Sequence, residues 1–345
     1  MQSITARFHE PAGLWYHGGA FIYALSAYAF GVWGLLQEAW WINIPAVVIW
    51  AHGMTIAAYL IHEAGHNTVF RQNEDNARLG RALNWVTGTA YGTFEDIRYK
   101  HFRHHMDNDD SVWFVPESFF ARHPWLLKVV KALEWAWVPA QEILMHAILM
   151  FSAFIIPGRR AQRRRQILVL VVRGSVFFSV LWLWPKVAIG YLVAYMLMMH
   201  ILRFMDALQH DYGANPSLFE TDPPSRFGGR KTEQLHTFSN PLSFNHDLPN
   251  WLVLNFGFHN AHHHRPTLPW YRLPAYYREH ISTEDASVIP FRQQLRMYAR
   301  HRVYRVDHAG GPFDEEQGKQ QDDYLAAARR GVLYGGNAVS FLTPF

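Results

Sequence analysis

Three short stretches of the sequence contain histidines at spacings that a single helix face can present. They are His62-Glu-Ala-Gly-His66, His101-Phe-Arg-His104-His105 and His259-Asn-Ala-His262-His263. Side chains at positions i, i+3 and i+4 of a helix lie on one face, so each stretch would direct its imidazoles at one place. Neutral imidazole is the commonest metal ligand in proteins, and the three stretches therefore predict metal binding.

A fourth position, His210, follows Asp206 by one helical turn at the end of an apolar run. We expect it to join the other histidines as a ligand. The set is then too large for one ion, which takes about four to six ligands, and it suits two ions. The candidate metal ligands are His62, His66, His101, His104, His105, His210, His259, His262 and His263.

The third stretch leaves a second register open, because His264 directly follows His263. In that register Asn260, His263 and His264 would share the helix face. The second stretch is followed by acidic residues, which could accept hydrogen bonds from the ring N–H groups of the ligands. These residues are Asp107, Asp109 and Asp110.

The composition limits the chemistry of the site. The chain has 345 residues with 21 His and no Cys, which excludes disulfides, iron–sulfur clusters and thiolate zinc sites within it. Imidazole and carboxylate remain as metal ligands. A net charge of +4 is too small to indicate nucleic acid as a partner.

Four apolar runs are long enough to cross a bilayer as helices. We expect spans at 14–36, 42–61, 166–184 and 187–208. The predicted fold class is an all-α integral membrane protein, with four transmembrane helices in two hairpins, interfacial helices and a cytosolic helical cap that carries the histidines. The predicted domains are a membrane catalytic domain over 1–275 and a cytosolic extension over 276–345, with a helix near 289–304.

The arginine-rich run at 158–165 orients these spans. Short loops rich in Lys and Arg stay in the cytoplasm, so every histidine stretch is expected on the cytoplasmic face of a multi-pass protein in a bacterial inner membrane. The apolar stretch 137–157 must then lie along the interface, because a crossing would put the second and third histidine stretches on opposite sides. The arginines could also bind an acidic partner surface.

The position of the site at a membrane indicates which metal to expect. A site at the ends of spans indicates a lipid or another long apolar chain as substrate. Breaking an unactivated C–H bond needs O₂ and a redox-active metal, and zinc has no redox chemistry. Iron is therefore the expected ion.

The three stretches resemble the histidine boxes HxxxH, HxxHH and HxxHH of the membrane fatty acid desaturase and hydroxylase superfamily, over about residues 40–275. The resemblance implies an enzyme with two iron ions that takes hydrogens from an acyl chain, using O₂ as co-substrate and two electrons. His210 is similar to the additional histidine between the second and third boxes of relatives, including membrane alkane hydroxylases. No catalytic residue is expected beyond the metal ligands.

Electrons must come from a separate protein of the ferredoxin or cytochrome type, because the chain has no cysteine and no evident haem module. Desaturation is the expected reaction, and hydroxylation of an acyl chain, alkane or other lipid is the alternative.

Two other classes fit the pattern less well. A zinc protease of the HExxH type would use Glu63 as its base but would leave most of the histidines without a role. A metal transporter would place its ligands deep inside the spans, whereas these histidines gather at span ends.

Overall fold

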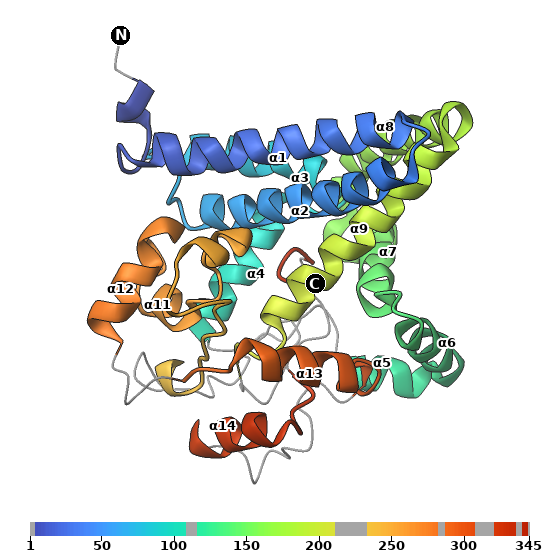
Figure 1. Ribbon diagram of the computed structural model, residues 1–345. Helices are drawn as coiled ribbons and strands as arrows, with labels where there is room; N and C mark the ends of the chain where they lie inside the picture. Colours follow the sequence, from blue (N-terminus) through green and yellow to red (C-terminus); the bar gives the residue numbers. More distant parts are fainter. Residues whose placement is uncertain are drawn as a thin grey trace. The chain divides into compact units, whose positions relative to one another are not determined.

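The computed structural model describes residues 4–107, 116–210, 233–281, 287–307, 321–335 and 340–343. In these ranges the chain is helical, with three isolated bridges and no β-strand. This confirms the predicted all-α fold class for the described part of the chain. The α-helices in Figure 1 are α1 (Gly13–Leu36), α2 (Trp40–Gly65), α3 (Asn73–Val86), α4 (Phe94–Asp107), α5 (Pro116–Arg122), α6 (Pro124–Trp135), α7 (Ala140–Ile155), α8 (Arg163–Leu183), α9 (Pro185–Asp206), α11 (His259–His264), α12 (Leu273–His280), α13 (Phe291–His301) and α14 (Gln321–Arg330).

Short 3₁₀ turns connect several of these helices. They are η1 (Ile4–Arg7), η2 (Pro157–Gln162), η3 (Leu248–Val253), η4 (Trp270–Arg272) and η5 (Tyr304–Val306). The chain forms two compact units: unit 1 contains 1–97 and 143–201, and unit 2 contains 98–142 and 202–345. Helices α4, α7 and α9 each begin in one unit and end in the other.

Four helices are long and apolar enough to cross a membrane, as the sequence predicts. They are Gly13–Leu36, Trp40–Gly65, Pro157–Leu183, which includes η2, and Pro185–Asp206. Helix α7 has only 16 residues, or about 24 Å at 1.5 Å per residue, which is shorter than the roughly 30 Å of a bilayer core. The interfacial position of this segment stays a prediction.

In unit 1, α1 and α2 run side by side and approach closely because small residues lie between them (Figure 1). A Cβ atom added at Gly31 would lie 2.6 Å from the Trp50 side chain, and one added at Gly53 would lie 2.5 Å from the Ala27 Cβ. Helices that lack a hydrophobic driving force between them associate through such close packing.

The arginine-rich run mostly forms bonds within unit 1. Arg159 pairs with Asp96 at 2.5 Å, and Arg165 donates hydrogen bonds to the backbone carbonyls of residues 90–92 at 2.7–3.3 Å. These bonds fix the turn between α3 and α4. Arg160 is exposed, so only part of the run is left for a partner surface.

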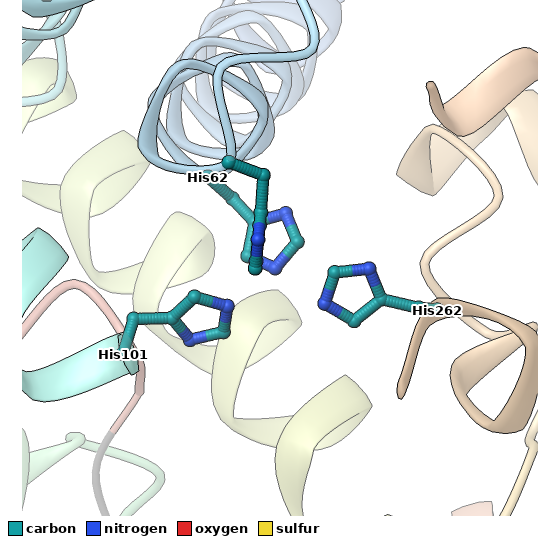
Figure 2. Close-up of side chains that lie close together, drawn as sticks. His62, His101 and His262 are labelled. Atoms are coloured by element: carbon teal, nitrogen blue, oxygen red, sulfur yellow. The ribbon is translucent and has the colours of Figure 1, made fainter. Parts of the chain in front are cut away.

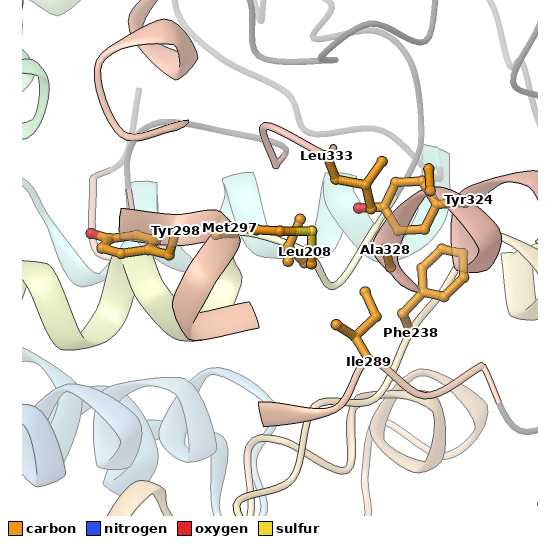
Figure 3. Packing of buried hydrophobic residues seen from close by; sticks show 10 residues of the cluster. Leu208, Phe238, Ile289, Met297, Tyr298, Tyr324, Ala328 and Leu333 are labelled. Carbon is orange, nitrogen blue, oxygen red and sulfur yellow. The ribbon is translucent and has the colours of Figure 1, made fainter. Parts of the chain in front are cut away.

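The main core cluster of unit 2 joins segments that are far apart in the sequence (Figure 3). It takes Leu208 from just after α9, Phe238 and Ile289 from loops, Met297 from α13 and Tyr324 from α14. The segment that carries His210 is therefore built into a core with the C-terminal part of the chain.

Candidate metal centre

The first histidine stretch lies at the C-terminal end of α2 in unit 1. Both His62 and His66 are buried, and their ring centroids are 4.8 Å apart. The helix ends here because Asn67 adopts a left-handed conformation with φ of 58°, and the amide of Thr68 closes the last turn on the Glu63 carbonyl at 3.1 Å. Helix α2 thus extends beyond the predicted span 42–61 and includes His62.

Helix α4 carries the second stretch. Its start is set by Thr93, whose Oγ1 accepts a hydrogen bond from the Asp96 amide at 3.0 Å. His101, His104 and His105 follow on one face of this regular helix, as the spacing predicts. His101 is buried, and the other two are partly buried.

The third stretch forms the short helix α11, which begins at His259 after two residues with positive φ, Leu254 at 43° and Asn255 at 56°. Asn260 anchors this helix, because its Oδ1 accepts a hydrogen bond from the Ser239 hydroxyl at 2.7 Å. The ring of His264 turns away to the Tyr276 hydroxyl at 2.7 Å. In the structure His259, His262 and His263 face inward, whereas Asn260 and His264 have other partners.

His210 lies four residues beyond the end of α9 and pairs with the loop at 236–240. Its Nδ1 is 3.3 Å from the His236 carbonyl, and the Phe238 amide donates a hydrogen bond to the Gln209 carbonyl at 2.8 Å. With Nδ1 bonded to a carbonyl, Nε2 is the nitrogen that could coordinate a metal.

Four of these imidazoles form one group within unit 2. The ligand nitrogens of His104, His210, His259 and His263 all lie within 4.8 Å of one another. The Nε2 atoms of His210 and His259 are 2.7 Å apart, and those of His104 and His263 are 3.3 Å apart. Two nitrogens bound to one ion at about 2.1 Å are at most about 4.2 Å apart, so small side-chain shifts would allow all four to bind one ion.

The other histidines of unit 2 lie beside this group. His105 Nε2 is 3.2 Å from His101 Nε2 and 3.1 Å from His262 Nε2. The rings of His101 and His262 face each other with centroids 6.0 Å apart (Figure 2). The ring of His105 is also 4.2 Å from that of His263, so it lies between the two sets. Unit 2 therefore brings seven of the predicted ligands together.

Glu233 is a residue of the site that the sequence does not reveal. Its Oε1 is 2.6 Å from His263 Nδ1. Burial, and next the neighbouring imidazoles, lower the pKa of His263 well below 6.5, so the ring is neutral and its Nδ1–H group donates a hydrogen bond to the Glu233 carboxylate. The Nε2 lone pair then points at the other histidines. Metal-bound histidines are commonly held in this way by a carboxylate.

Glu233 is missed because it has no fixed spacing to any histidine stretch and lies in a polar segment. The one sequence signal is its position three residues before His236, in the loop that pairs with His210. The acidic residues expected in this role, Asp109 and Asp110, lie outside the described residues, as does the side chain of Asp107.

The donor set fits a transition metal that accepts imidazole nitrogen. Imidazole rings that turn Nε2 toward one another suit Fe, Zn, Cu or Ni, whereas Mg and Ca prefer oxygen. If four of these imidazoles bind one ion, the neighbouring set of histidines can bind a second ion. Glu63, which an HExxH-type protease would use as its base, is buried and accepts a hydrogen bond from the Thr68 hydroxyl at 2.6 Å.

The comparisons with known proteins agree with this geometry. A family model described as fatty acid desaturase matches residues 38–295, which is more than half of the chain and includes all the predicted ligands. No curated protein and no solved structure matches the chain significantly. The chain belongs to the fatty acid desaturase family.

Proposed function

We propose that the protein is a membrane desaturase that uses two iron ions and O₂ to introduce a C=C bond into a fatty acyl or similar long apolar chain. The observation that carries the proposal is the buried four-imidazole group of His104, His210, His259 and His263 in a chain of the fatty acid desaturase family. The neighbouring set of His101, His105 and His262 supports a second ion.

The pair His62 and His66 would complete the ligands of this second ion. The support is their i, i+4 spacing, their burial at the end of α2 and the family to which the chain belongs. The two ions would then share nine imidazoles and no cysteine. An all-imidazole set would leave the positive charge of a bound metal largely uncompensated.

Bound iron would supply the redox chemistry that an unactivated C–H bond requires. The reaction balances when one O₂ takes four electrons and four protons. Two of each come from the two C–H bonds that break, two electrons come from a donor and two protons from solvent, to give an alkene and two waters. The chain's own residues hold the ions, and Glu233 fixes the tautomer of His263. Histidines that are almost fully buried, such as His262 and His263, keep bulk water from the ions.

The two electrons would come from a separate ferredoxin or cytochrome, because the chain has no cysteine to hold an iron–sulfur cluster. The arginine-rich loop supports a cytoplasmic position of the site in a bacterial inner membrane. The exposed Arg160 is a candidate contact for an acidic donor protein.

Metal analysis and lipid analysis together test the proposal. The purified protein should contain about two irons per chain, and cells that express it should gain an unsaturated acyl chain that is absent with His262→Ala. The matched control is His264→Ala, which removes an imidazole outside the cluster and should leave the product unchanged. If the product were a hydroxylated lipid, the proposed reaction would be hydroxylation and not desaturation. One zinc per chain would contradict the proposal of a di-iron enzyme.

A further inference from the structure

The described tail of the chain, Ser340–Thr343, lies outside the segment that the family model matches. It nevertheless forms some of the most deeply buried polar contacts in unit 2. Ser340 and Thr343 are 1% and 0% exposed. A short segment that is buried in this way and bonded through its backbone must fit one specific site.

Glu142, at the start of α7, is the main partner of this tail. It is fully buried, and it accepts three hydrogen bonds: from the Ser340 amide at 2.7 Å, the Ser340 hydroxyl at 2.6 Å and the Thr343 hydroxyl at 2.8 Å. A buried carboxylate is costly unless it is hydrogen-bonded. The tail therefore compensates a charge that would otherwise be unfavourable at this position.

The same four residues also contact the segments that carry the metal ligands. The Thr343 carbonyl accepts a hydrogen bond from Lys100 Nζ at 2.9 Å, directly before His101. The Phe341 amide donates to Asp206 Oδ2 at 3.1 Å, one turn before His210.

Aromatic contacts extend the connection to the third stretch. The Phe341 ring lies 5.8 Å from that of Phe256, which is 5.3 Å from the ring of His259. A second contact comes from α14, where the Tyr324 hydroxyl donates a hydrogen bond to the His210 carbonyl at 3.2 Å. The C-terminal part of the chain thus touches α4, the end of α9 and the approach to α11.

We propose that Ser340–Thr343, with Tyr324, is a clasp that holds the histidine-bearing segments of unit 2 in the arrangement that binds metal. This inference rests on the proposed metal centre. The clasp residues are positioning residues, because they act through Lys100, Asp206 and the His210 backbone. Loss of the clasp contacts should weaken metal binding strongly and should lower the stability of the folded protein only slightly.

Cobalt(II) binding tests the clasp, because cobalt absorbs visible light according to its ligands. Thr343→Val removes one hydroxyl at nearly constant volume. It should raise the apparent Kd for cobalt(II) roughly ten-fold, the lower end of the range for residues that support metal ligands, and shift the absorption bands. Thr343→Ser keeps the hydroxyl and should retain wild-type affinity and spectrum.

The matched control is Thr87→Val. Thr87 is as completely buried as Thr343 but lies in unit 1, where its hydroxyl bonds to the Leu83 carbonyl at 3.1 Å. This variant should lose a similar amount of thermal stability and keep the wild-type cobalt affinity. Tyr324→Phe keeps the ring and removes the hydroxyl that bonds to the His210 carbonyl, and it gives a second variant should Thr343→Val not fold.

The outcomes separate the two proposals. Wild-type protein that binds no cobalt rejects the metal centre and the clasp with it. Wild-type protein that binds cobalt, with Thr343→Val and Tyr324→Phe indistinguishable from it or from Thr87→Val, rejects the clasp alone.

Discussion

The contact between α1 and α2 in unit 1 and the buried acids of unit 2 depend on different kinds of interaction. In unit 1, α1 and α2 are held by shape, with Gly31 against Trp50 and Gly53 against Ala27. In unit 2, buried acids receive directed hydrogen bonds: Glu142 from the tail, and Glu233 from His263. Close packing positions whole helices, whereas imidazole rings that share one ion, as proposed for unit 2, need fixed orientations, which directed bonds provide.

The largest expected effect in unit 2 comes from a buried ion pair. Arg203 Nη1 lies 3.1 Å from Glu134 Oε1, and both side chains are 1% exposed. Arg203→Met should destabilise the protein by about 3–5 kcal/mol, because it leaves a buried carboxylate without its partner. Thermal unfolding in detergent measures this loss.

A double variant and a surface variant serve as controls for that measurement. Adding Glu134→Leu to Arg203→Met should recover much of the stability, since an apolar pair needs no charge compensation. Arg160→Met removes an exposed arginine and should change little. Equal losses for Arg203→Met and Arg160→Met would mean that the buried pair contributes nothing.

Unit 1 should lose most stability when a substitution adds side-chain volume between α1 and α2. Gly53→Ala places a Cβ atom 2.5 Å from that of Ala27 and 3.1 Å from the Ala24 carbonyl, and we expect a loss of about 1–3 kcal/mol from overpacking. Gly18→Ala, in α1, meets nothing within 4 Å and should be neutral in the same unfolding measurement. A neutral Gly53→Ala would show that shape is not what holds α1 to α2.

Within the metal centre, Glu233→Ala should weaken cobalt(II) binding at least ten-fold, or about 1.4 kcal/mol, because His263 loses the partner that fixes its tautomer. Equilibrium titration followed by absorbance measures the change. Glu279→Ala removes an exposed carboxylate, 76% accessible at the side chain, and should have no effect. Unchanged affinity in both variants would remove Glu233 from the site.

The smallest effect is expected at the surface pair of Asp247 and Arg278, which are 2.7 Å apart. The hydrogen bond from Arg278 lowers the pKa of Asp247 below 3.8. The folded state therefore holds this proton less tightly than the unfolded state, and the pair stabilises the protein above about pH 4 and loses its effect as the pH falls.

Both side chains of this pair are largely exposed, so the contribution should be under about 1 kcal/mol. Asp247→Asn should be slightly less stable than wild type at pH 7 and equally stable below the pKa of Asp247. A difference that grows in acid would have the wrong sign for this pair.

The features that the sequence predicts correctly are those that follow from the periodic pattern of nearby residues. Long apolar runs locate the four long helices, and the spacing within 101–105 places three imidazoles on one face of α4. The end of α2 is less predictable, because the helix continues through His62 until Asn67 adopts a positive φ.

Contacts between distant segments could not be predicted in this way. Glu142 and Thr343 are 201 residues apart, and no pattern within the Gly-rich tail indicates that it enters a core. Glu233 likewise acquires its role only through folding, since a single acid in a polar segment resembles any solvated carboxylate. The arginine-rich run indicates membrane orientation, but its bonds to the backbone at 90–92 depend on tertiary structure.

The core cluster that joins Leu208 and Phe238 to Tyr324 and Leu333 has a consequence for biosynthesis. The ribosome adds Tyr324 and Leu333 long after the spans and all the histidine stretches have emerged. Until then Leu208 has no complete core to pack into, and His210 lacks the hydroxyl that holds its carbonyl. The long apolar helices can therefore form early in synthesis, whereas the proposed metal centre can be complete only after Tyr324 and Leu333 have been added.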